Sequence, residues 1–156
     1  MRLHLIAIGR ARGGPEATLV ADWLTRFDRA ARPLGLGPAR LVELEDKRGR
    51  GREAESALIL DALPDGAALI ALDERGRTLT SPDFAGRLAD WRDGGRRDCA
   101  VALGGADGHA AVLRERSDLI LSFGPMVWPH MLARAMAAEQ LYRAASILAG
   151  APYHRV

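Results

Sequence analysis

The sequence predicts an α/β protein with a mostly parallel sheet that helices cover on both faces. Five short, mostly apolar segments recur along the chain, and each is separated from the next by a segment long enough for a helix. Strands buried in a parallel sheet are near-continuous apolar runs, and regular alternation of strands with helices builds such a sheet. Because 156 residues is the usual size of one compact domain, residues 1–156 are expected to form a single domain.

The expected strands span residues 3–8, 40–44, 67–72, 99–103 and 119–122. The first ends at Gly9, which is typical of a buried strand closed by a turn. The fourth contains Cys99, the single cysteine, which is expected to be a buried thiol that packs as a small apolar side chain. A disulfide within the chain is therefore excluded.

Between these strands, apolar side chains recur at helical spacing. Two such stripes are Leu19, Trp23 and Phe27, and Phe84, Leu88 and Trp91. Ser81 followed by Pro82 is typical of an N-cap with proline at the first helical position, so the second helix is expected to begin there. Each helix would place one apolar face on the sheet.

The last helix is expected at residues 131–149, because that segment consists largely of good helix formers and is followed by Gly150 and Pro152. It has two faces. One holds Leu132, Met136, Glu139 and Arg143, and the other holds Met131, Ala135, Ala138, Tyr142 and Ala145. The sheet would cover one face. A second copy of the protein, or another helix of the same core, would cover the small-residue face.

Ligands of open parallel sheets bind outside the carboxyl ends of the strands, so three strand ends are candidate site segments. These follow Leu72, Leu103 and Ser122. Gly104 and Gly105 match neither the dinucleotide nor the phosphate-loop fingerprint. They allow either a plain tight turn or a close approach of a flat ligand to bare backbone. The irregular segment 124–130 would either grip a ligand or simply pack its tryptophan into the core.

Charge and composition exclude several classes of protein. The apolar runs are far shorter than the ~20 residues of a membrane span, and the amino terminus lacks the pattern of a signal peptide, so a cytoplasmic protein without a membrane partner is expected. One cysteine and four scattered histidines form no metal-ligand spacing, and no metal is expected.

The formal charge of +2 identifies no partner. Residues 47–52 carry four cations, which suits either phosphate contacts or a solvated surface.

The chain end places a phenol, an imidazole and a guanidinium together at Tyr153, His154 and Arg155. Terminal residues are commonly frayed, and removing them is expected to leave the fold nearly unchanged. Histidine, however, exchanges protons near neutrality, and arginine stabilises anions or holds phosphate. The tail is therefore a candidate catalytic segment.

Taken together, these segments resemble one family along the whole chain: the ribosomal RNA large-subunit pseudouridine N3-methyltransferases, a one-domain branch of the SPOUT class. The matching pieces are Ile8-Gly9, Lys47-Arg48-Gly49, Leu72-Asp73, Leu103-Gly104-Gly105 with Gly108, Ser122-Phe123 through Pro129-His130, Glu139 to Ala144, and Tyr153-His154-Arg155. The final segment is the most specific. The chain departs from the family at Arg77, where lysine is common, at Val127, where threonine is frequent, and at Val156.

The resemblance implies a C-terminal trefoil knot, an exception to unthreaded topology, and a homodimer with active sites built across its interface. It implies S-adenosylmethionine as methyl donor and an assembled ribosome as the substrate that carries the pseudouridine. The donor would be held by Leu72, Gly104, Gly105, Gly124, Pro125, Met126, Val127, Trp128 and Pro129. His130, Arg143, Tyr153, His154 and Arg155 would lie near the target base.

Methylation of an imide nitrogen requires removal of its proton, or stabilisation of the anion, or both. His154 or His130 is the expected base, and Arg143 and Arg155 the expected anion-stabilising groups; arginine alone is the alternative. One rival function is an inactive ribosome-binding protein, which would not bind the donor. Another is a receiver-like module, for which Asp73 and Glu74 are the only candidate acidic cluster at a strand end.

Overall fold

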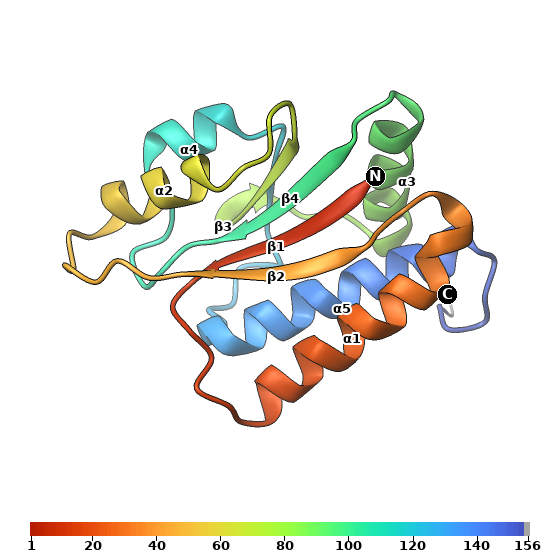
Figure 1. The fold of residues 1–156 in the computed structure, drawn as a ribbon, viewed down its shortest axis with the longest axis horizontal. Coiled ribbons are helices and arrows are strands. Elements are labelled where there is room, and N and C mark those ends of the chain that lie inside the picture. The colour runs from red at the N-terminus through yellow and green to blue at the C-terminus, as the bar shows by residue number, and fades with distance from the viewer. Residues whose placement is uncertain (155–156) are drawn as a thin grey trace.

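The computed structural model describes residues 1–154 and contains one five-stranded sheet with five α-helices around it (Figure 1). The strands are β1 (Arg2–Ile8), β2 (Ala39–Leu44), β3 (Ala68–Arg77), β4 (Asp98–Leu103) and β5 (Leu119–Leu121). All neighbouring strands are parallel, and their order in the sheet is β2-β1-β4-β3-β5. The parallel α/β sheet predicted from the alternation of segments is confirmed.

The helices cover both faces of the sheet, as predicted. They are α1 (Pro15–Ala31), α2 (Arg52–Asp61), α3 (Ser81–Asp93), α4 (Ala111–Arg116) and α5 (His130–Leu148), and a short 3-10 turn, η1 (Arg32–Leu34), follows α1. Alternate side chains of the strands feed two separate cores. Leu5 and Ile70 pack with α1, α3 and α5, whereas Ile6 and Leu69 pack with α2 and α4.

The predicted apolar stripe of α1 is correct at Phe27 but one residue off at its other two positions. Leu19 is exposed and Trp23 is half-buried, while Val20, Leu24, Phe27 and Ala31 face the core. The cause is the neighbouring helix: α1 packs along α5, and the packed face is the one that meets the sheet and α5 together.

Two boundaries also differ from the sequence prediction. Thr80, rather than Ser81, caps α3, because its hydroxyl accepts the backbone N–H of Asp83. β3 does not end at Leu72. It bulges between Leu72 and Arg77, and both of these residues pair with Leu121 of β5. The polar residues 73–76 looked like a loop because a bulge needs no apolar side chains.

The small-residue face of α5 belongs to the core of its own chain. Ala138 and Ala145 are fully buried, and Ala135 is nearly so. Of the two alternatives raised by the sequence for this face, packing within the chain is the observed one. The side chain of Arg134, on the same helix, is also buried; it pairs with Glu43 and donates to the carbonyl oxygens of Ile8 and Gly9. It thereby fixes α5 to the carboxyl ends of β1 and β2.

Two further observations concern the class of protein. Cys99 is fully buried, and burial raises the pKa of its thiol to about 12, which confirms the inert, apolar role expected for it. In the described part of the chain, no helix is both long and apolar enough to cross a bilayer.

Candidate functional site

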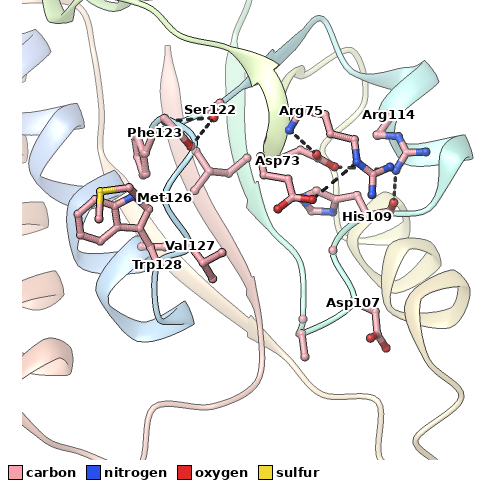
Figure 2. A pocket seen from close by; sticks show the side chains of 17 residues that line it. Asp73, Arg75, Asp107, His109, Arg114, Ser122, Phe123, Met126, Val127 and Trp128 are labelled. Atoms are coloured by element: carbon pink, nitrogen blue, oxygen red, sulfur yellow. Dashed lines mark hydrogen bonds and ion pairs between the residues drawn. The ribbon is translucent and has the colours of Figure 1, made fainter.

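A pocket of about 290 Å³ opens at the carboxyl ends of the central strands (Figure 2). Three segments line it: the bulge of β3, the turn that follows β4, and the irregular segment between β5 and α5. In Figure 2 the side chains of Ser122, Phe123, Met126, Val127 and Trp128 lie on one side of the pocket, and those of Asp73, Arg75, His109 and Arg114 on the other. These are the three strand ends that the sequence singled out.

Six of the nine residues expected to hold a methyl donor line this pocket: Leu72, Gly105, Gly124, Met126, Val127 and Trp128. Gly104, Pro125 and Pro129 do not. Gly104 serves the turn instead, because a Cβ on it would lie 2.8 Å from the carbonyl oxygen of Gly108. Pro129 is the N-cap of α5 and so determines where that helix begins.

The turn after β4 is tight, and its residues Gly105 and Gly108 line the pocket. The backbone N–H of Gly108 donates to the carbonyl oxygen of Gly105 over 3.1 Å. A Cβ on Gly105 would lie 2.5 Å from Oε2 of Glu55, on α2. Burial, followed by the charges of Asp46 and Asp107, raises the pKa of Glu55. Glu55 was not singled out by the sequence, since nothing in its spacing relates it to the glycine pair.

The segment 124–129 presents apolar side chains at the rim of the pocket. Met126, Val127 and Trp128 are 71%, 88% and 41% exposed. The hydroxyl of Ser122 anchors the segment, because it accepts the N–H of Gly124 over 3.1 Å and lies 3.2 Å from the carbonyl oxygen of the same residue. Gly124 has a φ of 106°, a conformation that favours glycine. Large apolar side chains held open to solvent are typical of a ligand or partner site.

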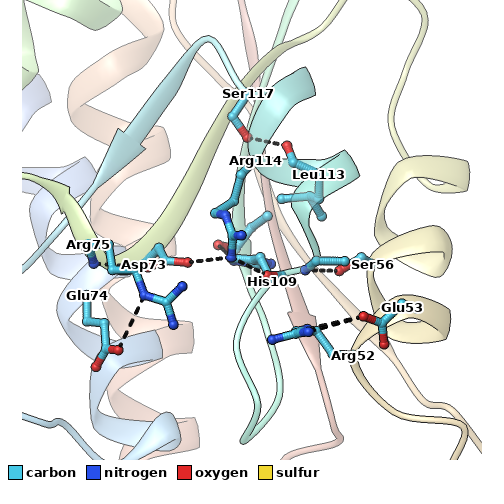
Figure 3. Close-up of polar contacts among 12 residues, drawn as sticks. Arg52, Glu53, Ser56, Asp73, Glu74, Arg75, His109, Leu113, Arg114 and Ser117 are labelled. Atoms are coloured by element: carbon cyan, nitrogen blue, oxygen red, sulfur yellow. Dashed lines mark hydrogen bonds and ion pairs between the residues drawn. The ribbon is translucent and has the colours of Figure 1, made fainter.

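The opposite wall is polar (Figure 3). Nη1 of Arg114 lies 3.9 Å from the Asp73 carboxylate and donates to the carbonyl oxygen of His109 over 2.7 Å. The His109 ring is buried; its Nε2 lies 3.2 Å from the Ala102 carbonyl oxygen, and its Nδ1 has no partner among residues 1–154. Burial lowers the pKa of His109. These side chains were missed by the sequence because only the fold brings them to Asp73.

His130 opens α5 beside the pocket but does not line it. Burial lowers the pKa of its imidazole, and the nearby charge of Arg134 lowers it further. Its Nε2 is buried and lacks a partner in the described chain. Both effects disfavour the protonated imidazole, and the neutral form is the one that accepts a proton.

Three of the other expected catalytic residues, Arg143, Tyr153 and His154, form a separate cluster around Glu139. The Glu139 carboxylate accepts from Arg143 over 2.6 Å and from the Tyr153 hydroxyl over 2.9 Å. Arg143 Nη1 is 3.5 Å from Nδ1 of His154, and its guanidinium lies 4.8 Å from the centre of the Tyr153 ring. Tyr153 also packs on Tyr142, with ring centroids 4.7 Å apart. Arg155 lies outside the described residues.

Within one chain this cluster is remote from the pocket. Ala133 lines the pocket, and Arg143 follows ten residues later on the same helix, which corresponds to about 15 Å along the axis. In Figure 1 the C-terminal end of the described chain lies at the opposite end of the molecule from the start of α5. The structure thus brings six of the expected donor residues together at the pocket, and Arg143, Tyr153 and His154 together at the other end of α5, but it does not join the two sets.

Comparison with known proteins identifies the family. A model of a family described as predicted SPOUT methyltransferases matches residues 1–154. The chain is 65% identical to the ribosomal RNA large subunit methyltransferase H of Cereibacter sphaeroides and 63% identical to that of Ruegeria pomeroyi, over 100% of each chain in both cases. The protein of the same name from Dinoroseobacter shibae is 60% identical over the full length of both chains. With its strand-end pocket and this chain-long match, the protein belongs to the SPOUT methyltransferase family.

Proposed function

We propose that this protein transfers a methyl group from S-adenosylmethionine to N3 of a pseudouridine in large-subunit ribosomal RNA, on the assembled ribosome. Two findings support the proposal together. A pocket at the strand ends joins most of the expected donor residues, and relatives named as large-subunit ribosomal RNA methyltransferases match the chain from end to end. Such a protein would work in the cytoplasm, where ribosomes are.

The pocket suits S-adenosylmethionine, which carries a sulfonium, an amine, a carboxylate and an adenine ring. At about 290 Å³ it lies near the lower end of the usual size for small-molecule sites. Leu72, Phe123 and Met126 provide apolar cover for the ring, and the carboxylates of Asp73 and Asp107 complement the positive charges of the donor. When bound, the donor supplies a methyl carbon that is open to attack by a nucleophile.

The residues of this chain would then prepare the nucleophile. The imide N–H of a uracil-type ring must lose its proton, and the imidazole of His130 or of His154 would accept it. Arg143 and Arg155 would stabilise the resulting anion and hold neighbouring phosphate. Glu139 positions Arg143 and Tyr153, because both donate to its carboxylate.

A single chain leaves this arrangement incomplete, because the Arg143–His154 cluster and the pocket are at opposite ends of α5. We therefore propose a symmetric homodimer in which the tail of one copy reaches the pocket of the other. The exposed apolar side chains Met126, Val127 and Leu132, at the pocket end of α5, support an interface there. The sequence suggested a dimer through the small-residue face of α5, but the alanines of that face are buried within their own chain.

We also propose that the C-terminal segment is threaded as a trefoil knot. Close packing of backbone at the end of β5 supports it: the N–H of Ser122 donates to the carbonyl oxygen of Arg77, and Gly76 lies against Ile120 and Leu121. A knotted chain must thread before it can fold. Fusion of a large stable domain to the C-terminus should therefore slow refolding from the fully unfolded state far more than the same fusion at the N-terminus.

The test of function is direct methyl transfer. Labelled S-adenosylmethionine and the purified protein are incubated with ribosomes, with free large-subunit RNA, or with neither, using ribosomes from a strain that lacks the enzyme. Mass spectrometry of the digested RNA should find one additional methyl group on N3 of a pseudouridine, and only in the ribosome sample. Label on a different base contradicts the proposed target. Donor binding without any transfer favours an altered substrate, and absence of donor binding favours the rival function of an inactive ribosome-binding protein.

A further inference from the structure

Two loops at the carboxyl end of the sheet carry five cations between them. Residues 9–14 connect β1 to α1, and residues 45–51 connect β2 to α2. We call their cations, with the first residue of α2, the basic strip: Arg10, Arg12, Lys47, Arg48, Arg50 and Arg52. The two loops are adjacent, because the N–H of Gly9 donates to the Leu44 carbonyl oxygen and Arg10 lies 4.0 Å from Glu45. Both loops lie at the same end of the sheet as the start of α5 (Figure 1).

The second loop is held in shape by Asp46 and is not a freely moving chain. The Asp46 side chain is 4% exposed and accepts the backbone N–H groups of Arg48 and Arg50. Burial alone would raise the pKa of Asp46, but these two amides and the Arg50 guanidinium hold it below its usual value. Gly49, with φ of 58°, completes the turn. The buried carboxylate is thus used by the loop's own backbone and by Arg50, while Lys47 and Arg48 are exposed.

The first loop is anchored as firmly. Glu43 accepts the backbone N–H of Ala11 over 2.7 Å and pairs with the buried Arg134 of α5. Arg134 also donates to the carbonyl oxygens of Ile8 and Gly9. The loop that carries Arg10 and Arg12 is therefore tied to the helix that begins at the donor pocket.

Several cations of the strip have no carboxylate partner. Arg12, Lys47 and Arg48 are exposed, and no ion pair joins them to an acid within residues 1–154. Arg10 has only the long contact to Glu45, and its side chain is 66% exposed. Fixed, unpaired and exposed cations on neighbouring loops are the feature expected of a surface that binds phosphates.

The strip is close to the donor pocket but separated from it by acids. Arg52 opens α2, and Glu55 of the same first turn lies against Gly105, which lines the pocket. Asp46 and Asp107 are near enough to Glu55 to raise its pKa, though burial raises it more. This acidic group repels phosphate and favours a cationic donor inside, while the strip attracts phosphate outside. The acidic residues thus lie beside the pocket, which would take a cationic donor, and the basic residues lie outside it, where phosphate would bind.

We infer that the basic strip binds the phosphate backbone of the ribosomal RNA that flanks the target nucleotide. The inference rests on the proposed function for the identity of the RNA. The recognised chemistry is a run of phosphate groups, read by charge and not by base edges.

The experiment uses two double variants, Lys47→Gln/Arg48→Gln and Arg10→Gln/Arg12→Gln. The matched control is Arg87→Gln/Arg97→Gln, which removes the same charge from exposed arginines on α3 and directly before β4. Arg50 and Arg52 are left in place because they contact Asp46 and Glu53. Binding to purified large ribosomal subunits is measured between about 50 and 200 mM KCl, a range in which phosphate contacts dominate the salt dependence.

Each strip variant should lower the slope of log K against log salt by about 1.5, the value for two lost phosphate contacts. The KM for subunits should rise about tenfold at the higher salt, again from those two contacts. The kcat, the donor affinity and the melting temperature should stay as in the wild type, and the control should change none of these. A wild-type slope in both strip variants, or an equal loss in the control, overturns the inference.

The two proposals fail separately. If the wild type methylates ribosomes while the strip variants keep a wild-type slope and KM, the function stands and the strip is a solvated surface. If the strip controls salt-dependent binding but no methyl group is transferred, the strip stands and the proposed function is wrong.

Discussion

The absence of a side chain at Gly105 leaves space both for the pocket and for the Glu55 carboxylate. It lines the pocket, and its Cβ position faces the Glu55 carboxylate at 2.5 Å. Gly105→Val should therefore weaken donor binding and also destabilise the fold by about 1–3 kcal/mol through overpacking. Adding Glu55→Ala should recover most of the stability, because the two residues are in direct contact, but not the donor affinity.

Urea unfolding and calorimetric titration with S-adenosylmethionine separate these two effects. Gly86→Val on α3, where a Cβ meets no atom within 4 Å, is the control for adding a valine side chain at a glycine that has open space around it. Undiminished donor binding in a folded Gly105→Val/Glu55→Ala protein would mean that the donor pocket is wrongly assigned.

The buried His109 makes stability depend on pH. Burial lowers the pKa of its imidazole below 6.5, although the Asp73 carboxylate nearby acts in the opposite direction. Below pH 6.5 the unfolded chain binds a proton that the folded protein excludes, so the stabilisation is complete above that pH and is lost as the pH falls through the folded pKa. Between about pH 7.5 and 5.5, the free energy of unfolding should therefore fall, because the unfolded chain takes up a proton that the folded protein disfavours at this group.

Urea unfolding at the two pH values measures this loss. His109→Gln should show a smaller difference between them than the wild type, while His130, whose pKa is also lowered, continues to contribute in both proteins. If the free energy of unfolding differs between the two pH values by the same amount in the variant and the wild type, His109 is not a cause of the pH dependence.

Among the elements, β3 and β5 depend on a glycine in the bulge. A Cβ on Gly76 would lie 2.6 Å from the carbonyl carbon of Leu121 and 2.7 Å from that of Ile120. These are backbone atoms of the neighbouring strand, so no rotamer change relieves the contact. Gly76→Ala should push β5 away from β3 and cost roughly 2–4 kcal/mol, the range of strong overpacking and lost strand pairing.

Thermal and urea unfolding provide the measurement. Gly86→Ala is the matched control, because it sits in a helix with open space around its Cβ position. It should be neutral or stabilise by about 0.5–1 kcal/mol. If Gly76→Ala is as stable as Gly86→Ala, the close approach of β5 to the bulge is not part of the folded state.

α5 and the tail behave as one element. Tyr153 stacks near Tyr142 and Trp23 and donates to Glu139, so the end of the described chain is docked on α5 and α1. These contacts argue that deleting Tyr153 destabilises the fold, against the expectation that removal of the tail leaves it nearly unchanged. His154→Ala leaves these packing contacts in place and is the cleaner change for testing catalysis.

For the whole molecule, the separation of pocket and tail predicts sharing of sites between two copies. Light scattering should find twice the chain mass. When Gly105→Val and His154→Ala chains are co-expressed with different tags and the mixed dimer is purified, one of its two sites has both an intact pocket and an intact tail. It should show about half of wild-type activity, because symmetry gives two equivalent sites.

Each variant alone should be nearly inactive as a homodimer. An inactive mixed dimer, or a fully active monomer, would place the pocket and the tail of the same chain in one site. That outcome would require the tail to leave Glu139 and cross the length of α5.

The sequence by itself determined the parallel α/β sheet, because strand-length apolar runs and helical stripes are local patterns. It also indicated the three strand ends of the pocket, since the carboxyl ends of parallel strands share one edge. Only the tertiary structure decided which α1 face is buried, that β3 continues through a bulge, and that Glu55, Arg114 and His109 join the pocket region. These features depend on contacts between segments far apart in the chain, and the spacing of residues along the sequence does not reveal such contacts.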